Sequence, residues 1–281
     1  MINSSITKIT FDTNTLNSVL YPDKSQRKNK NEAEIVLEAI KSGKLQGFFS
    51  ETLVTLEGIT RQNRPSTIGS TRAIATSRSI EKNQVEIKLG FQFTPSLMNR
   101  QHSERVNDAI YLKIFPLRTG LEMGNFHLDR KIYPLYEPDG GIAELVRCMD
   151  EVHRLSACLR CKGVGKEAAI RLGKKLSDKY RTDAEKYDKN GNYKQELFHK
   201  GLGRAETKSE VRQVSKVVAE WADGDSVAAH YGFGIDLFCT EDFGRSSDEP
   251  SVLDEMHRLW LKSDFGINFV TLCDLAQMLT K

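Results

Sequence analysis

The sequence contains no long apolar run, and this absence argues against a membrane protein. No segment approaches the roughly 20 consecutive apolar residues that a membrane-spanning helix needs. The first residues, Met1 to Thr7, also lack the charged and then apolar pattern of a secretory signal peptide. We therefore expect a cytoplasmic protein that has no membrane partner.

Cysteines are few, with five in 281 residues, and they are scattered along the chain. An odd and scattered set indicates reduced thiols rather than a disulfide framework. Cys158 and Cys161, with Cys148 and His153 upstream, have a spacing that zinc ligands can show. On one helix, however, Cys148, His153 and Cys158 would point in different directions, so ordinary thiols are favoured over a zinc site.

Two common ligand-binding loops are also incomplete. The segment Gly163-Val-Gly-Lys166 lacks the full spacing and the Ser or Thr of a phosphate-binding loop. The segment 188–192 resembles the start of a calcium loop, but Tyr193 takes the place of the required Gly and His199 that of the closing Glu. We expect a simple turn there.

Charge, in contrast, is abundant and unevenly distributed. Residues 1–60 carry no net charge, residues 61–207 carry +9 and residues 208–281 carry −6, which together give the overall +3. An acidic region beside a basic one suits a metal-dependent enzyme that acts on a polyanion. Ordinary surface charge explains the same numbers and stays open as the alternative.

Apolar periodicity predicts an α/β protein. Short β-branched and aromatic runs at 6–11, 45–49, 235–239 and 267–271 are typical of strands. Apolar residues at helical spacing indicate helices over 32–42, 51–60 and 272–279, and one that runs into Trp221. A hydrophobic fraction of 39% is enough for a core. Residues 1–60 and 208–281 are thus predicted to be two parts of one parallel-sheet core.

The middle of the chain, residues 61–207, is predicted to be a basic α+β insertion in this core. Residues 61–72 indicate a polar linker. Alternation over 85–93 and 110–114 predicts a pair of antiparallel strands.

Helices are predicted in the second half of the insertion, over 142–159 and 166–180, followed by a polar and mobile segment at 181–207. The helix 166–180 is basic. Its Arg171, Lys174 and Lys175 are the expected nucleic-acid-binding residues.

Four acids lie where they could reach the carboxyl edge of the predicted sheet. Asp12 directly follows the first strand, and Asp242 comes just past a later one, after Thr240. Glu57 is placed on the apolar side of the helix 51–60, where a carboxylate needs a partner. Asp225 is taken as the start of a helix. Ligands bind at this edge in α/β sheets, and Mg²⁺ prefers carboxylate ligands.

The third acid can be chosen in two ways, because Asp223 and Asp225 both precede Val227, Ala228 and Ala229. Asp225 is preferred because it is closer to the predicted helix start, and Asp223 is held in reserve. Asp12 could also be a simple helix cap, and Glu51 is read as a charge that complements a helix dipole.

These segments together resemble the PIN domain, a metal-dependent nuclease fold. The matching pieces are Asp12-Thr-Asn14 after a strand, Ser50 to Glu57, Asp225 before Val-Ala-Ala, and Thr240-Glu-Asp-Phe243 after another strand. The resemblance covers the two outer parts, somewhat under half of the chain. It implies a PIN-like sandwich of helices around a parallel sheet.

The resemblance also implies an activity, a cofactor and a partner. Asp12, Glu57, Asp225 and Asp242 would be catalytic ligands of Mg²⁺ or Mn²⁺, with Asn14 and Thr240 in supporting roles. The expected function is an endonuclease that hydrolyses phosphodiester bonds, in RNA before DNA. A regulatory protein or a second copy of the chain is left open as a further partner. The alternative is a catalytically weak binding or scaffolding module that uses the insertion as its interface.

Overall fold

The computed structural model describes residues 6–24, 29–53, 55–70, 72–81, 84–92, 100–119, 134–244 and 249–280. Its strands are β1 (Thr7–Phe11), β2 (Leu45–Ser50), β3 (Arg72–Glu81), β4 (Gln84–Gln92), β5 (Phe115–Leu117), β6 (Leu237–Cys239) and β7 (Asn268–Val270). Its first helices are α1 (Thr13–Leu20), η1 (Pro22–Lys24), α2 (Lys30–Lys41), η3 (Glu51–Leu53), η4 (Arg61–Asn63), α3 (Arg64–Gly69) and α4 (Arg100–Tyr111). The later helices are α5 (Gly141–Cys161), α6 (Lys166–Tyr180), α7 (Asp183–Lys186), α8 (Phe198–Leu202), α9 (Lys208–Gly232), α10 (Glu255–Phe265) and α11 (Leu272–Thr280).

Five of these strands form one parallel sheet in the order β5-β2-β1-β6-β7, so the protein is α/β. The central strand β1 pairs with β2 from Thr7 opposite Leu45 to Phe11 opposite Phe49. On its other side β1 pairs with β6, which comes more than 220 residues later in the chain. The carboxyl ends of β1, β2 and β6 consequently lie side by side, as the sequence predicts.

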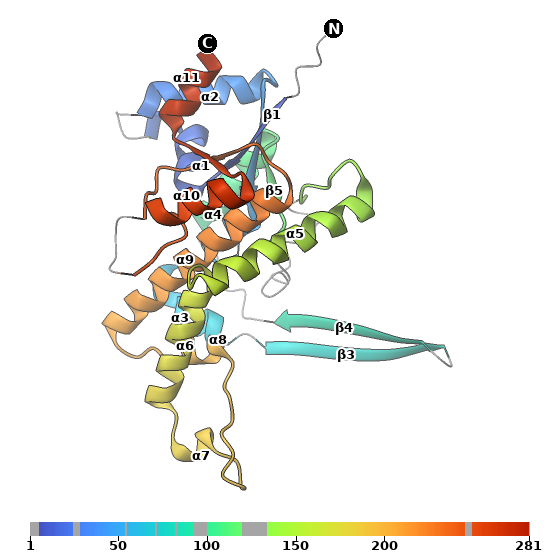
Figure 1. Ribbon diagram of the computed structural model, residues 1–281, viewed down its shortest axis with the longest axis vertical. Helices are drawn as coiled ribbons and strands as arrows, with labels where there is room; N and C mark the ends of the chain where they lie inside the picture. Colours follow the sequence, from blue (N-terminus) through green and yellow to red (C-terminus); the bar gives the residue numbers. More distant parts are fainter. Residues whose placement is uncertain are drawn as a thin grey trace.

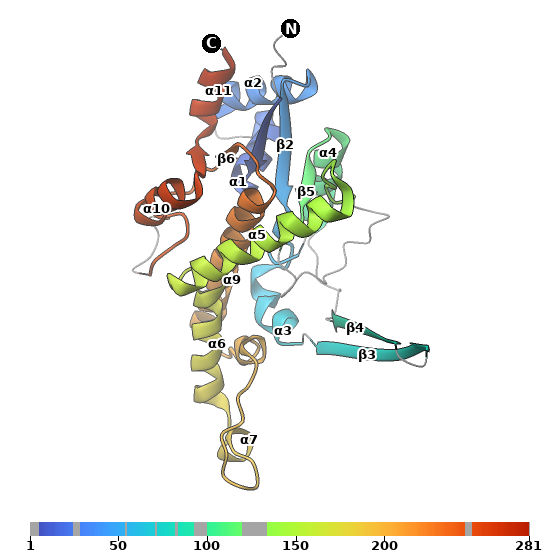
Figure 2. The ribbon, with the colours of Figure 1, turned by 45° about the vertical axis from the view of Figure 1, so that its right-hand side comes forward.

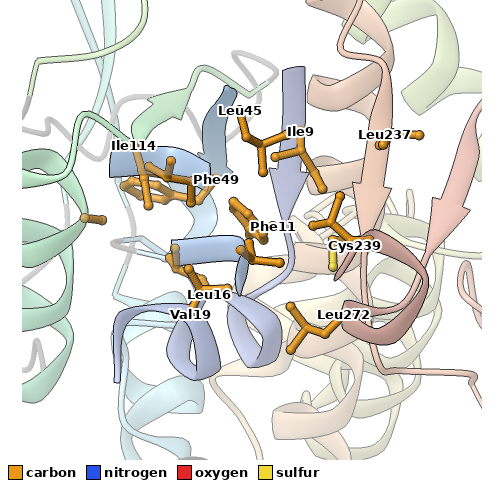
Figure 3. Packing of buried hydrophobic residues seen from close by; sticks show 14 of the residues in the cluster. Ile9, Phe11, Leu16, Val19, Leu45, Phe49, Ile114, Leu237, Cys239 and Leu272 are labelled. Atoms are coloured by element: carbon orange, nitrogen blue, oxygen red, sulfur yellow. The ribbon is translucent and has the colours of Figure 1, made fainter. Parts of the chain in front are cut away.

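Helices cover both faces of the sheet because alternate strand residues point to opposite sides. Figure 3 shows one face, where Ile9 and Phe11 of β1 pack with Leu16 and Val19 of α1. This layer also contains residues of α2, α4 and α11. On the other face, buried residues of β2, β5 and β6 pack against α5, α9 and α10. The result is a three-layer sandwich.

A third cluster of buried residues contains no strand residue and lies beyond the sheet. It joins α3, α6, α8 and α9, including Trp221, with Leu56 and Ile59 of the irregular segment before η4. Figures 1 and 2 place α3, α6 and α8 below the sheet, and they show the β3–β4 hairpin projecting away from the body. Helix α9 is the element shared with the sandwich, because its second half packs on the sheet.

Two predicted elements of the insertion are wrong. Residues 110 and 111 end helix α4 and residues 112–114 form the turn before β5, so the expected strand is not there, and β4 pairs with β3 instead. Val106 and Ala109, three residues apart, are buried on one face of α4. The short apolar alternation over 110–114 does not indicate that face. Strand β5, placed by sequence in the insertion, is the edge strand of the core sheet. The boundary drawn at residue 61 therefore divides the sheet.

Two further predictions about local order are corrected. Residues 61–72 hold η4 and α3 rather than a plain linker. Residues 181–207 are not loose, because Arg181, His199 and Leu202 are buried. Helix α8 packs there against α6 so closely that a Cβ on Gly201 would lie 1.9 Å from the Gly173 carbonyl oxygen. The absence of side chains at both positions, rather than a hydrophobic stripe, permits this contact.

The described helices include none that combines the length and apolar character needed to cross a bilayer.

The α6–α8 contact predicts a strong effect of one methyl group. Gly201→Ala should lower the free energy of unfolding by roughly 2–3 kcal/mol, because the added Cβ meets backbone that must shift. Lys174→Ala, on the exposed side of α6, is the matched control and should stay within about 0.5 kcal/mol of the parent. Urea unfolding followed by circular dichroism measures both. Equal stability of the two variants would contradict the contact.

Candidate functional site

The first candidate residue, Asp12, lies directly after β1 and caps helix α1. Its Oδ1 accepts a hydrogen bond from the backbone N–H of Thr13 at 2.7 Å. Its Oδ2 accepts one from the Thr240 hydroxyl at 3.0 Å, across to the segment that follows β6. Asp12 is thus both the helix cap and a residue at the sheet edge, with each oxygen held by a different donor.

Glu57 reaches the same place from an irregular segment. The sequence predicts a helix over 51–60, but among the residues of this range that the structure describes, Glu51–Leu53 form a 3₁₀ turn and the others form no helix. The buried Glu51 carboxylate accepts hydrogen bonds from the N–H and hydroxyl of Thr119, so Glu51 is more than a dipole partner. Glu57 itself accepts a 2.5 Å hydrogen bond from the Thr13 hydroxyl. Thr13 therefore links the first two acids.

The preference for Asp225 over Asp223 is corrected by the course of α9. This helix starts at Lys208, after a capping box of Thr207 and Glu210, and continues unbroken through both aspartates. Neither acid starts a helix. Two residues correspond to about 200° of rotation, so only one of them can face the sheet edge.

That residue is Asp223. A small cavity at the end of β1 and β2 is lined by Asp12, Glu57 and Asp223 together with Thr13 and Ser226. Asp225 instead lines a separate cavity beside α5 and α6. The helix start expected at Asp225 is wrong. Gly224, which precedes Asp225, lies inside α9 and allows this helix to approach Gly165, whose Cα would lie 2.9 Å from a Cβ at position 224.

Asp242 is close to the cavity but does not line it. It is exposed, and its Oδ1 accepts a hydrogen bond from the N–H of Gly244 in its own turn. Its backbone N–H donates to the Thr240 hydroxyl at 3.0 Å. Its charge still contributes to raising the pKa of Asp12 and of Asp223.

The three carboxylates around the cavity disfavour one another's ionisation. Burial raises the pKa of Asp12 to about 7, and the charge of Glu57 adds to this effect. Burial also raises the pKa of Glu57, against which the Thr13 hydrogen bond and Arg64 act. The pKa of Asp223 lies well above its ordinary value through burial and the charges of Asp12 and Glu57. Such mutual repulsion is typical of sites that bind a cation.

Two arginines supply positive charge near these acids. Arg64 also holds the backbone, and Arg105 lies in α4. Arg64 is buried and donates from Nη1 to the Ser215 carbonyl at 2.6 Å and from Nε to that of Ile59. It thereby fixes the segment of Glu57 onto α9. Arg105 of α4 acts on Glu57 through its charge and lowers that pKa as well.

The donors fit a hard divalent cation in type, and the space fits one ion. Carboxylate oxygens are the ligands that Mg²⁺ and Mn²⁺ prefer, and the cavity has about 10 Å³ of free space, room for one water-sized body. In the part of the chain that the structure describes, however, no group of three or more His, Cys, Asp or Glu side chains is arranged to hold a metal. The same finding applies to the described Cys148, His153, Cys158 and Cys161.

The remaining candidates lie apart from the cavity. Asn14 is exposed on α1 and does not line it. Arg171, Lys174 and Lys175 are exposed on α6, and Arg171 donates to the Gly163 carbonyl at 2.7 Å. The segment around Asp188 is a turn in which its Oδ1 accepts from the N–H groups of residues 190 and 192.

Sequence reasoning missed two contributors to the site, Thr13 and Arg64. A signal for Thr13 was present, because a hydroxyl directly after a helix-capping acid lies at the same edge. No sequence signal marks Arg64, because it acts through carbonyls that are remote along the chain.

The raised pKa of Asp12 predicts that this side chain destabilises the metal-free protein at neutral pH. The folded state retains the proton up to about pH 7, whereas the unfolded chain releases it near its ordinary pKa of 3.8. Asp12→Asn should therefore gain stability over the parent as the pH rises from 4 to 7. The gain should level off above pH 7 at on the order of 4 kcal/mol.

This difference is measured by urea unfolding in EDTA at several pH values. Asn is as good a helix cap as Asp, so the cap is preserved. Asp150→Asn, an exposed change on α5, is the control. A stability difference between Asp12→Asn and the parent that does not vary with pH would contradict the assignment.

Comparison with protein-family models, with curated proteins and with solved structures finds no match to this chain.

Proposed function

We propose that this protein is a metal-dependent endonuclease with a PIN-like core, and that it cleaves RNA in preference to DNA. The observation that carries the proposal is the meeting of Asp12, Glu57 and Asp223 at one cavity on the carboxyl edge of the sheet. Their raised pKa values show that ionisation of the clustered acids is unfavourable without a counter-charge, which a bound cation would supply. The short PIN-like segments of the sequence supply the reaction class by analogy.

In this proposal Asp12, Glu57 and Asp223 hold Mg²⁺ or Mn²⁺, and Asp242 supports them from the rim. A bound divalent ion supplies an activated water and stabilises the charge that builds up on a phosphodiester. Thr240 orients Asp12 and Thr13 orients Glu57 through the hydrogen bonds described above. Because these donors come from two segments next to β1 and β6, the carboxylates keep their directions when they ionise.

Substrate contacts are proposed for the positive part of the chain. Residues 61–207 carry the net charge of +9, and the exposed Arg171, Lys174 and Lys175 belong to it. Phosphate groups of a strand would contact such side chains without sequence preference. In this proposal the residues that cleave the phosphodiester and the residues that bind the strand belong to different segments of the chain.

The competing function is a nucleic-acid-binding or scaffolding module with little catalysis. The observation that favours it is the absence, among the described residues, of an assembled group of three metal-binding side chains. The two functions differ in whether the acids are needed: a nuclease requires them, whereas a module retains binding without them.

Cleavage of labelled single-stranded RNA in Mn²⁺ tests the proposal and the choice of the third acid. Asp12→Asn and Asp223→Asn should each lower the cleavage rate by roughly 100-fold, the scale of removing one charge-stabilising group. Asp225→Asn is the matched control on the same helix and should cleave at nearly the parental rate. EDTA should abolish the activity.

Two results would reject parts of this proposal. Cleavage that survives both Asp12→Asn and Asp223→Asn would show that the acids have no catalytic role. Metal-independent RNA binding with no cleavage of any nucleic acid would favour the module.

Metal binding can be measured without activity. Mn²⁺ should raise the melting temperature of the parent protein, because a ligand that binds only the folded state stabilises it by mass action. The rise should disappear in Asp223→Asn and persist in Asp225→Asn. An equal rise in both variants would place the ion elsewhere.

A further inference from the structure

A second and larger cavity, of about 190 Å³, lies on the other side of α9. Asp223 faces the acidic cavity, and Asp225, about 200° further around the helix, faces this one. The proposed hydrolysis makes no use of it. Its volume exceeds the 150 Å³ of engineered protein cavities that take up benzene, so a small ligand fits.

Three elements form the walls of this cavity. Helix α5 contributes His153, Ser156, Ala157 and Arg160, which follow the i, i+3, i+4, i+7 spacing of one helix face. Helix α9 contributes Trp221, Gly224 and Asp225, and the start of α6 contributes Gly165 and Lys166. The lining thus combines cationic, hydroxyl and aromatic groups.

Positive charge exceeds negative charge in this lining. Arg160 and Lys166 are the basic side chains of the lining besides His153, and Asp225 is the one carboxylate among the residues that line it. The Lys166 ammonium lies 5.3 Å from the centre of the Trp221 ring and 5.6 Å from that of Phe198, which restricts its position. Arg160 has a long contact of 3.9 Å with Glu167, outside the lining.

The wall at Gly165 is held in place by a buried carboxylate. Glu220 accepts hydrogen bonds from the N–H groups of Gly165 and Val252, each at 2.9 Å, and from the Ser251 hydroxyl at 2.8 Å. These three donors satisfy Glu220, which does not line the cavity. The turn before α6 is therefore fixed against α9.

From this lining we propose that the cavity binds a phosphomonoester group. Arg160 and Lys166 pair with its charge, and Ser156 and His153 supply hydrogen bonds to its oxygens. The group can come from a free mononucleotide or from the 5′ end of an RNA strand, since both carry the same phosphate. This site does not depend on the nuclease proposal, because it shares no lining residue with the acidic cavity.

Isothermal titration in EDTA, which removes any metal-dependent reaction, tests this site. The probes are inorganic phosphate, AMP, adenosine, and one short RNA with either a 5′-phosphate or a 5′-hydroxyl end. AMP or the 5′-phosphorylated RNA should bind, and adenosine and the 5′-hydroxyl RNA should bind at least tenfold more weakly. The stronger of the two phosphorylated probes identifies the source of the phosphate.

Variants locate the binding within the cavity. Arg160→Gln and Lys166→Gln should each weaken binding by roughly tenfold, the scale of one charge-assisted hydrogen bond. Asp225→Asn should strengthen it, because a repelling carboxylate is removed. Lys41→Gln, an exposed change on α2 outside the cavity, is the control and should bind like the parent.

The proposal is overturned if neither AMP nor the 5′-phosphorylated RNA binds the parent protein. It is also overturned if adenosine binds as tightly as AMP, or if both Arg160→Gln and Lys166→Gln bind like the parent. Arg160 is exposed, so its variant keeps the test valid even if Lys166→Gln loosens the packing around Trp221.

Discussion

The geometry of this protein depends on one uninterrupted helix. Helix α9 has 25 residues, which corresponds to roughly 37 Å, long enough to cross from the helical cluster to the sheet. Its first half buries Val214, Val218 and Trp221 in that cluster, and its second half buries Val227 and Ala228 against the sheet. Successive residues of a helix are rotated by roughly 100° around its axis. Burial of both halves of α9 therefore fixes the directions in which Asp223 and Asp225 point.

The acids at the sheet edge reduce the stability that this packing provides. Three half-buried carboxylates with raised pKa values cost folding free energy at neutral pH. The fold tolerates them because hydroxyl and backbone donors hold Asp12 and Glu57, and because Arg64 offsets part of the charge. A natural sequence keeps such a local conflict where it serves a function.

The sheet core was predictable because its strands have strong local signals. The β-branched and aromatic run of β1 and the acid after the first strand both correspond to observed features. Helices α5 and α6 follow their apolar spacing nearly to the residue. The identity and order of these elements therefore come from short-range patterns.

The sequence predictions are wrong where contacts between residues remote in the sequence determine the local structure. The helix start expected at Asp225 is wrong because α9 continues through Gly224, whose lack of a side chain permits the approach of Gly165. The segment around Glu57 has helical spacing, but the buried pairing of Glu51 with Thr119 holds it in turns. None of these partners is near in sequence, so periodicity could not reveal them.

The pairing of β1 with β6 has a consequence for the order of assembly. Ile9 meets Leu237 only after more than 220 residues have been added, so closing the sheet fixes a very long loop. During synthesis the acidic cavity therefore stays incomplete until the ribosome has made α9 and β6. The nascent chain carries Asp12 and Glu57 long before it carries Asp223, so the three acids can meet only after α9 and β6 have been added.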